Sequence, residues 1–247
     1  MKTTNNTVLI TGGTAGIGLE LAKQFNANGN NVIITGRDAA RLQNAVDQLP
    51  GVTGIVSDVT RAADVDQLVA RLQAEFPRLN VVINNAGRAF VHDLAQADGT
   101  YEKAAEEIAT NYLSIIRLNE KLLPILRQQA EAAIVDVSSI VAYTPNHIIA
   151  TYSATKAALH SYTVSLRHAL AKNSRVKVFE LMPPLVNTEF SSEIGGGEHG
   201  IPPSVVAEEL LKAFENNDYE VRVGNTAYIY ELSRKSPDEA FAVLNPA

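Results

Sequence analysis

The stretch that decides the fold is Thr7–Gly18, which reads TVLITGGTAGIG. Its first five residues, Thr7–Thr11, form an apolar, β-rich run, and a helical period of apolar residues follows the glycines over Gly16–Asn28. The free N–H groups and partial positive charge at the start of such a helix attract phosphate, and small residues let the backbone approach a pyrophosphate. The stretch therefore predicts a strand, loop and helix that together bind a nucleotide.

The rest of the chain alternates in the same way between short apolar runs and longer segments of helical period. Beyond the first strand, strands are predicted over Asn31–Thr35, Val52–Ser57, Asn80–Asn84, Ala132–Val137, Val176–Leu181 and Glu220–Val223. A long helical region is predicted over about 100–129, and another helix over Tyr152–Lys172. Strands that are apolar on both faces and separated by helices are typical of a parallel sheet covered on both sides. We expect an α/β fold with one domain over residues 1–247.

Length and composition narrow the class of protein. The chain has 247 residues, of which 46% are hydrophobic and 19% charged, and its net charge is −6 with no run of like charges. This balance argues against nucleic acid or an anionic membrane as the main partner. There is no cysteine, and the five histidines lack metal-ligating spacing, so we expect no metal. No signal peptide or membrane-spanning stretch is evident, which indicates a cytoplasmic protein.

A tyrosine and a lysine four residues apart lie on one face of a predicted helix, downstream of two serines. These are Tyr152 and Lys156, preceded by Ser138 and Ser139 at the end of the fifth strand. A phenol has a pKa of about 10, so giving up its proton at neutral pH costs about 4 kcal/mol, and a neighbouring ammonium lowers that cost. Either serine could donate a hydrogen bond to a developing oxyanion. The pattern predicts a proton donor beside the nucleotide site.

With these motifs in order, the chain resembles the classical short-chain dehydrogenase/reductase family over most of its length. The family pattern Thr-Gly-x-x-x-Gly-x-Gly matches Thr11–Gly18, and its Asn-Asn-Ala-Gly matches Asn84–Gly87. The family's Asn, Ser, Tyr and Lys match Asn111, Ser139, Tyr152 and Lys156, with the serine thirteen positions before the tyrosine. The resemblance implies a doubly wound, Rossmann-type fold and identifies Ser139, not Ser138, as the catalytic serine. It also implies that Asn111 positions a water that links Lys156 to solvent.

The resemblance also implies a set of residues that bind a nicotinamide dinucleotide. These are Gly12, Thr14, Gly16, Ile17, Gly18, Arg37, Asp58, Val59, Asn85, Ala86, Gly87, Tyr152, Lys156, Pro183, Val186 and Thr188. One departure is Pro183-Pro184, where the family usually has Pro-Gly. The segments 220–224 and 232–237 resemble a bacterial branch of the family labelled DltE-like.

The residues that end the second strand favour NADP(H) over NAD(H). An acidic side chain at this place binds the ribose hydroxyls of NAD, whereas an arginine accommodates the 2′-phosphate of NADP. Here the acidic position is Gly36, and Arg37 follows it. The alternative is that Arg37 is solvated and Asp38 binds the ribose. We expect instead that Asp38 caps the next helix.

The segment after the sixth strand, about residues 189–201, is expected to be a flexible substrate loop because it is rich in glycine. Its acidic residues Glu189, Glu193 and Glu198, with His199, make it polar and disfavour anionic substrates. Arg88, Tyr143 and His147 are weaker candidates for the pocket. The apolar tail, 227–244, is expected to pack on the body or on a partner subunit.

The leading hypothesis is an NADP(H)-dependent oxidoreductase that reduces a ketone or aldehyde to an alcohol, or catalyses the reverse. A catalytically weak NADP(H)-binding sensor or scaffold is the alternative, and a lyase or epimerase with transient hydride transfer is a third possibility. The set Asn111, Ser139, Tyr152 and Lys156 argues against a sensor, because a sensor needs no proton relay. Resemblance implies a homodimer or homotetramer.

Overall fold

The centre of the structure, a computed structural model that describes residues 1–96 and 99–246, is a seven-stranded sheet. Its strand order is β3-β2-β1-β4-β5-β6-β7, and every neighbouring pair is parallel. The strands are β1 (Thr7–Thr11), β2 (Asn31–Gly36), β3 (Thr53–Val56), β4 (Val81–Asn84), β5 (Ala132–Val137), β6 (Val176–Met182) and β7 (Glu220–Arg222). All seven were predicted from the sequence, to within two residues at each end.

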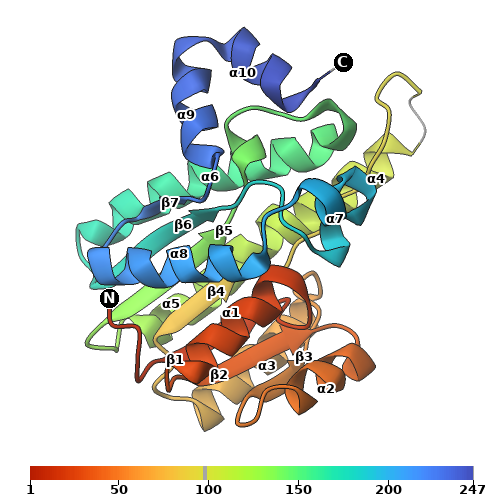
Figure 1. The fold of residues 1–247 in the computed structure, drawn as a ribbon. Helices are drawn as coiled ribbons and strands as arrows, with labels where there is room; N and C mark the ends of the chain where they lie inside the picture. Colours follow the sequence, from red (N-terminus) through yellow and green to blue (C-terminus); the bar gives the residue numbers. More distant parts are fainter. Residues whose placement is uncertain (97–98, 247) are drawn as a thin grey trace.

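Helices cover both faces of this sheet (Figure 1). The longer helices are α1 (Gly16–Ala27), α2 (Ala39–Asp47), α3 (Ala62–Glu75), α4 (Thr100–Ile108), α5 (Ser114–Leu126), α6 (Ala150–Ala171), α8 (Pro203–Asn216), α9 (Thr226–Lys235) and α10 (Pro237–Leu244). Short helical turns are η1 (Ala109–Leu113), η2 (Ile140–Ala142), η3 (His147–Ile149), η4 (Glu189–Ile194) and α7 (Gly196–His199). Within the described chain, no helix is both long and apolar enough to cross a bilayer.

Alternating residues of the strands feed two separate apolar cores. In β1, Val8 and Ile10 pack with side chains of α1, α2 and α8, whereas Leu9 points to the other face and packs with those of α3, α5 and α6. Because successive side chains of a strand point to opposite faces, a strand between two helical layers must be apolar throughout. The predicted fold class, a doubly wound Rossmann-type sheet, is confirmed.

The sheet grows in opposite directions from β1, which pairs with β2 on one side and with β4 on the other. In doubly wound sheets the connections leave on opposite sides at such a point, which opens a crevice outside the carboxyl ends of the strands. The loops that follow Thr11, Gly36, Asn84 and Val137 all lie at this edge. The fold therefore brings the predicted motifs together at one place.

Two segments have more internal structure than the sequence indicated. The helical region predicted after residue 100 consists of α4 and α5, with a π-helical turn, Ala109–Leu113, between them. The glycine-rich segment 189–201, predicted as a substrate loop, contains the short helical turns η4 and α7. The tail forms α9 and α10, which pack on the body of the same chain beside the loop before α6 (Figure 1).

Candidate active site

A cavity of about 760 Å³ lies along the carboxyl ends of the strands. It runs from the ends of β2 and β3, past the glycine loop, to α6, η4 and the C-terminal end of α10. A volume of this size is within the range of cofactor and ligand pockets. Predicted residues on its wall are Gly12, Thr14, Gly16, Ile17, Arg37, Asp58, Val59, Asn85, Ala86, Gly87, Ser139, Tyr152, Lys156, Pro183, Val186 and Thr188.

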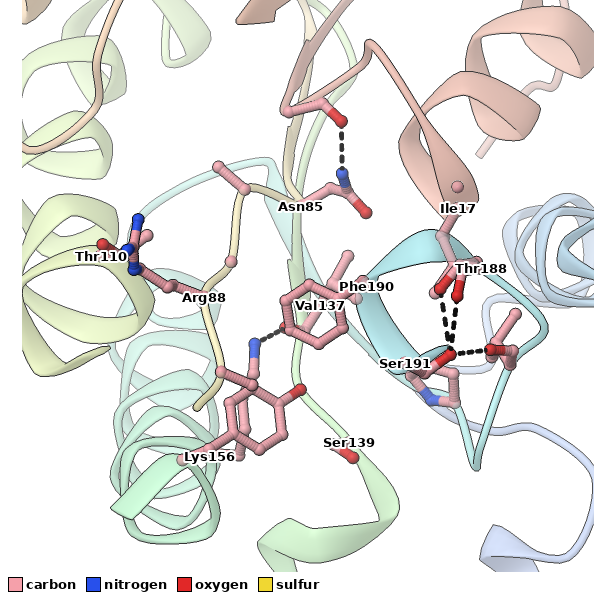
Figure 2. Close-up of a pocket in the computed structure, with 18 of the residues that line it drawn as sticks. Ile17, Asn85, Arg88, Thr110, Val137, Ser139, Lys156, Thr188, Phe190 and Ser191 are labelled. Atoms are coloured by element: carbon pink, nitrogen blue, oxygen red, sulfur yellow. Dashed lines mark hydrogen bonds between the residues drawn. The ribbon is translucent and has the colours of Figure 1, made fainter. Parts of the chain in front are cut away.

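The glycine loop is held in place by the end of β4. The Asn85 side chain donates hydrogen bonds to the carbonyl oxygens of Thr11 (3.0 Å) and Gly12 (3.1 Å), one of which is drawn in Figure 2. The Thr11 hydroxyl accepts from the backbone N–H groups of Asn85 and Ala86. Gly12 has a φ of 65°, and a Cβ on it would lie 2.9 Å from Ala86 Cα. Only glycine allows this close approach of the two loops.

Gly18 does not reach the cavity wall, although the sequence predicted it as a cofactor contact. A Cβ at this position would lie 2.3 Å from the carbonyl oxygen of Gly12 and 2.4 Å from Asn85 Nδ2. The glycine therefore serves the packing of α1 against the loop rather than a contact inside the cavity.

The end of β2 carries no acidic side chain, and any side chain at Gly36 would require Thr14 to move. A Cβ on Gly36 would lie 2.6 Å from Thr14 Cγ2. Arg37 and Arg41 both line this end of the cavity. The Asp38 carboxylate accepts a 2.9 Å hydrogen bond from the Arg41 backbone N–H and so caps α2, as expected from the sequence.

Two buried hydroxyls on the wall beside Gly36 have no hydrogen-bond partner among the described residues. They belong to Thr35 and Ser57. A buried hydroxyl without a partner is costly, so such groups are usually satisfied by a ligand or water. This end of the cavity is therefore equipped for a polar ligand.

The opposite end brings Ser139, Tyr152 and Lys156 together. Tyr152 is 8% exposed and Lys156 is 3% exposed. Lys156 Nζ donates a 2.8 Å hydrogen bond to the carbonyl oxygen of Val137 and lies 5.5 Å from the centre of the Tyr152 ring (Figure 2). The Phe190 ring packs on the Tyr152 ring with 5.9 Å between their centres.

The two serines differ in their partners. The Ser138 hydroxyl donates a 2.5 Å hydrogen bond to Glu180, which is itself fully buried. The Ser139 hydroxyl accepts from the Val141 N–H at 3.3 Å and lies close enough to Tyr152 to lower the pKa of its phenol. Of the two, Ser139 is thus the one that acts on the tyrosine.

Burial is the largest influence on the pKa values of Tyr152 and Lys156. It raises the pKa of Tyr152 well above its ordinary value, Ser139 acts in the opposite direction, and Glu107 adds to the rise. The sequence predicted that Lys156 would lower this pKa, but in the structure the effect of burial is larger and the pKa is raised, while the ammonium donates to the carbonyl oxygen of Val137. Burial also lowers the pKa of Lys156 to about 8, although nearby carboxylates oppose this. Desolvation disfavours both charged forms.

Asn111 lies behind the cavity wall, in the π-helical turn Ala109–Leu113. Its side chain donates to the carbonyl oxygen of Arg88 (2.8 Å) and to the Thr155 hydroxyl (2.9 Å), and accepts from the Arg88 N–H (2.8 Å). Both amide donors are therefore used inside the protein. The side chain joins the loop after β4 to α6, and neither donor is free to hold a water.

Of the three weaker candidates for the pocket, only Arg88 lines it. Arg88 lines the cavity and forms a 3.0 Å ion pair with Glu106. Tyr143 is off the wall and hydrogen-bonds to Arg222. His147 is also off the wall, with its Nδ1 2.8 Å from Asn245.

Of the acidic residues predicted for the substrate loop, only Glu189 reaches the cavity wall. Glu193, Glu198 and His199 are exposed and lie off its wall. The segment instead contributes Phe190, Ser191 and Ile194, together with Glu189, which is paired with Arg41 at 2.5 Å.

Sequence reasoning missed the contribution of the tail to the site. Val243 and Leu244 of α10 line the cavity, as do Asn146 and Ile148 before α6. The apolar composition of the tail indicated that it packs on something. It did not indicate where, because the contact joins residues about a hundred positions apart.

Comparison with known proteins agrees with this architecture. The sequence model of the short chain dehydrogenase family matches residues 6–198. An uncharacterised oxidoreductase of Bacillus subtilis named DltE is 37% identical over 99% of this chain and 98% of its own length. The chain belongs to the short chain dehydrogenase family, whose members are oxidoreductases, and resembles its DltE-like branch, as the sequence predicted.

Solved structures share the fold over nearly the whole chain. A short chain dehydrogenase from Burkholderia cenocepacia in complex with NADP has a TM-score of 0.87 and 25% identity, covering 99% of both chains. Another, from Burkholderia phymatum in complex with NAD, has a TM-score of 0.89 and 19% identity, covering 97% of this chain and 96% of that one. The second likeness supports the fold alone.

Proposed function

We propose that this protein is an NADP(H)-dependent oxidoreductase that reduces a ketone or aldehyde to an alcohol, or catalyses the reverse reaction. The observation that carries the proposal is the arrangement of the cavity. One continuous space joins the glycine loop and Arg37 at one end to Ser139, Tyr152 and Lys156 at the other. A nucleotide-binding end and a proton-donating end therefore face the same ligand space.

The chain's own residues fit a nicotinamide dinucleotide. The start of α1 offers N–H groups for a pyrophosphate, and Gly12 and Gly16 leave its approach open. The unpartnered hydroxyls of Thr35 and Ser57 supply hydrogen bonds for the adenosine half. When bound, such a cofactor would supply or accept the hydride.

The preference for NADP(H) is argued from the end of β2. Gly36 offers no carboxylate to hold a ribose hydroxyl and packs against the Thr14 methyl group, and Asp38 is engaged as the cap of α2. Arg37 and Arg41 place two guanidinium groups along the same wall. Guanidinium binds phosphate through paired, charge-assisted hydrogen bonds, so this end favours a 2′-phosphate.

In this proposal Tyr152 gives its phenolic proton to the substrate oxygen as hydride reaches the carbonyl carbon, which yields the alcohol. Ser139 donates a hydrogen bond to the same oxygen and stabilises its developing charge. Lys156 stabilises the phenolate that remains and holds the proton that restores it. Asn111 is a positioning residue, because it fixes the loop at Arg88 on the helix that carries Tyr152.

The test compares NADPH consumption over a panel of ketones and aldehydes between the native chain and Tyr152→Phe. Removing a positioned proton donor should lower kcat/KM by about 10²–10⁴-fold while NADPH affinity is retained. Tyr143→Phe is the matched control, since that phenol is off the cavity wall, and should keep native turnover. Equal turnover in the native chain and Tyr152→Phe would reject the mechanism. Tight NADPH binding without turnover on any carbonyl would favour the sensor.

A further inference from the structure

Apolar side chains predominate on the cavity wall beyond Tyr152, which Asn146 and Asn225 also line. We call this region the apolar end, formed by Val141, Ile148, Phe190, Ile194, Val243 and Leu244. Val141, Ile148, Ile194 and Leu244 belong to one hydrophobic cluster with Tyr152. The Phe190 ring also packs on the Tyr152 ring, with 5.9 Å between their centres. The apolar end is thus the surface next to the group that would donate the proton.

The charged side chains of the described cavity wall are either at the adenosine end or already paired. Arg88 pairs with Glu106 at 3.0 Å, and Glu189 pairs with Arg41 at 2.5 Å. Lys156 is buried and bonded to a backbone carbonyl. A charged group on a ligand at the apolar end would therefore lose water without gaining a partner, which is costly.

The C-terminal part of this wall is fastened to the loop that leads into the Tyr152 helix. The Asn245 side chain accepts from the His147 N–H (2.7 Å) and donates to the carbonyl oxygen of Pro145 (3.0 Å). The Asn146 side chain donates to the carbonyl oxygen of Leu244 (2.8 Å). These bonds hold Val243 and Leu244 in a fixed place relative to Tyr152. We call them the clamp.

We propose that the apolar end binds an uncharged carbonyl compound with an apolar chain or ring, which packs against Val243 and Leu244. The proposal rests on the proposed function, because it names the substrate class of that same site. Burial of apolar surface supplies the affinity, so each added methylene should tighten binding by about fourfold until the wall is filled.

Binding is measured without turnover by the fluorescence of prodan, an uncharged naphthyl ketone whose emission shifts in apolar surroundings. The straight-chain ketones from butan-2-one to nonan-2-one then compete with prodan for the NADP⁺-loaded protein. Affinity that rises steeply with chain length supports the proposal. A charged analogue of equal length, such as a keto acid, should compete at least tenfold more weakly.

Val243→Asp places a carboxylate on the wall. It should weaken binding of the longest ketone by more than tenfold and leave butan-2-one nearly unchanged. Phe241→Asp is the matched control, because both residues lie on α10 and are about half exposed (49% and 45%) but only Val243 lines the cavity. Asn245→Ala, which removes two of the three bonds of the clamp, should also make the affinity depend less steeply on chain length.

The outcomes separate this inference from the proposed function. Affinity that does not depend on chain length, or equal losses in Val243→Asp and Phe241→Asp, would overturn the inference even if short carbonyls are reduced. Chain-length-dependent binding without NADPH consumption on any ketone would support the apolar site and overturn the reductase proposal instead.

Discussion

The Lys156 ammonium group donates a 2.8 Å hydrogen bond to the carbonyl oxygen of Val137, the last residue of β5. This bond ties the side chain to the edge of the sheet where the cavity lies. The same Nζ lies 5.5 Å from the centre of the Tyr152 ring. The protein thus holds a desolvated cation at the site.

The rate of carbonyl reduction should depend on pH through the protonation of Lys156. Burial lowers the pKa of Lys156 to about 8, so the ammonium is present below that pH and is lost above it. If the charge is needed to stabilise the Tyr152 phenolate, kcat/KM for carbonyl reduction is constant below pH 8 and falls about tenfold per pH unit above it. Steady-state kinetics over this range measure the profile.

The control for this profile is Lys156→Arg, which keeps a positive charge throughout the range. Its activity, even if lower, should lack the decline near pH 8. A decline at the same pH in both proteins would assign the titration to another group.

Coenzyme preference should depend on Arg37. Charge-assisted hydrogen bonds contribute about 1.5–3 kcal/mol, so Arg37→Ala should raise the KM for NADPH by roughly 10- to 100-fold and change the KM for NADH little. Arg61→Ala is a suitable control, because Arg61 is also exposed but lies off the cavity wall. An unchanged NADPH/NADH ratio in Arg37→Ala would remove the argument for NADP.

Asp38 tests the competing explanation, in which it binds the ribose of NAD. As the cap of α2, Asp38→Ala should lower the free energy of unfolding by about 1 kcal/mol, measured by urea denaturation. Its KM values for NADH and NADPH should stay native. A selective rise in the KM for NADH would instead show that Asp38 contacts the ribose.

The sequence predicts most of this site because its motifs sit at strand ends, which a doubly wound sheet gathers at one edge. Thr11–Gly18 and Asn84–Gly87 were predicted to adjoin the same ligand, and both flank the cavity. The capping role of Asp38 also follows from local chemistry, since a short acceptor before a helix has few other partners.

The parts that the sequence does not predict depend on local geometry or distant contacts. The π-helical turn at Asn111 involves one extra residue within a helix, which changes the apolar period too little to be read. The clamp between Asn245 and His147 joins residues 98 positions apart without any periodic signal. The sequence also does not predict that the pKa of Tyr152 is raised, because this depends on how deeply the phenol is buried. The four-residue spacing indicates only that Lys156 is near Tyr152, not how its ammonium is oriented.

A buried carboxyl at the end of β5 should make stability depend on pH. Burial raises the pKa of Asp136 from 3.8 to about 6, although its side chain accepts hydrogen bonds from Asn84 and Thr163 (both 2.8 Å). The folded state therefore binds more protons than the unfolded state between these pH values, so the free energy of unfolding falls as pH rises through this window. The difference between the two pKa values corresponds to roughly 3 kcal/mol.

Urea denaturation at pH values below, within and above the window measures this decrease. Asp136→Asn cannot titrate and should lack it, whereas Asp218→Asn, which changes an exposed carboxyl, should retain it. The same slope in the native chain and Asp136→Asn would show that other groups titrate on folding.

The packing of α1 against the glycine loop should make Gly18 indispensable for stability. A Cβ there would lie 2.3 Å from the carbonyl oxygen of Gly12 and would displace Asn85, whose side chain bonds to that oxygen. Gly18→Ala should therefore lower the free energy of unfolding by about 1–3 kcal/mol, and because the loop shifts, it should also weaken NADPH binding. The control is Gly197→Ala in α7, where no atom lies within 4 Å of the added methyl group, so stability should be native or slightly higher. Equal stability of the two variants in urea denaturation would mean that α1 moves away from the loop without cost.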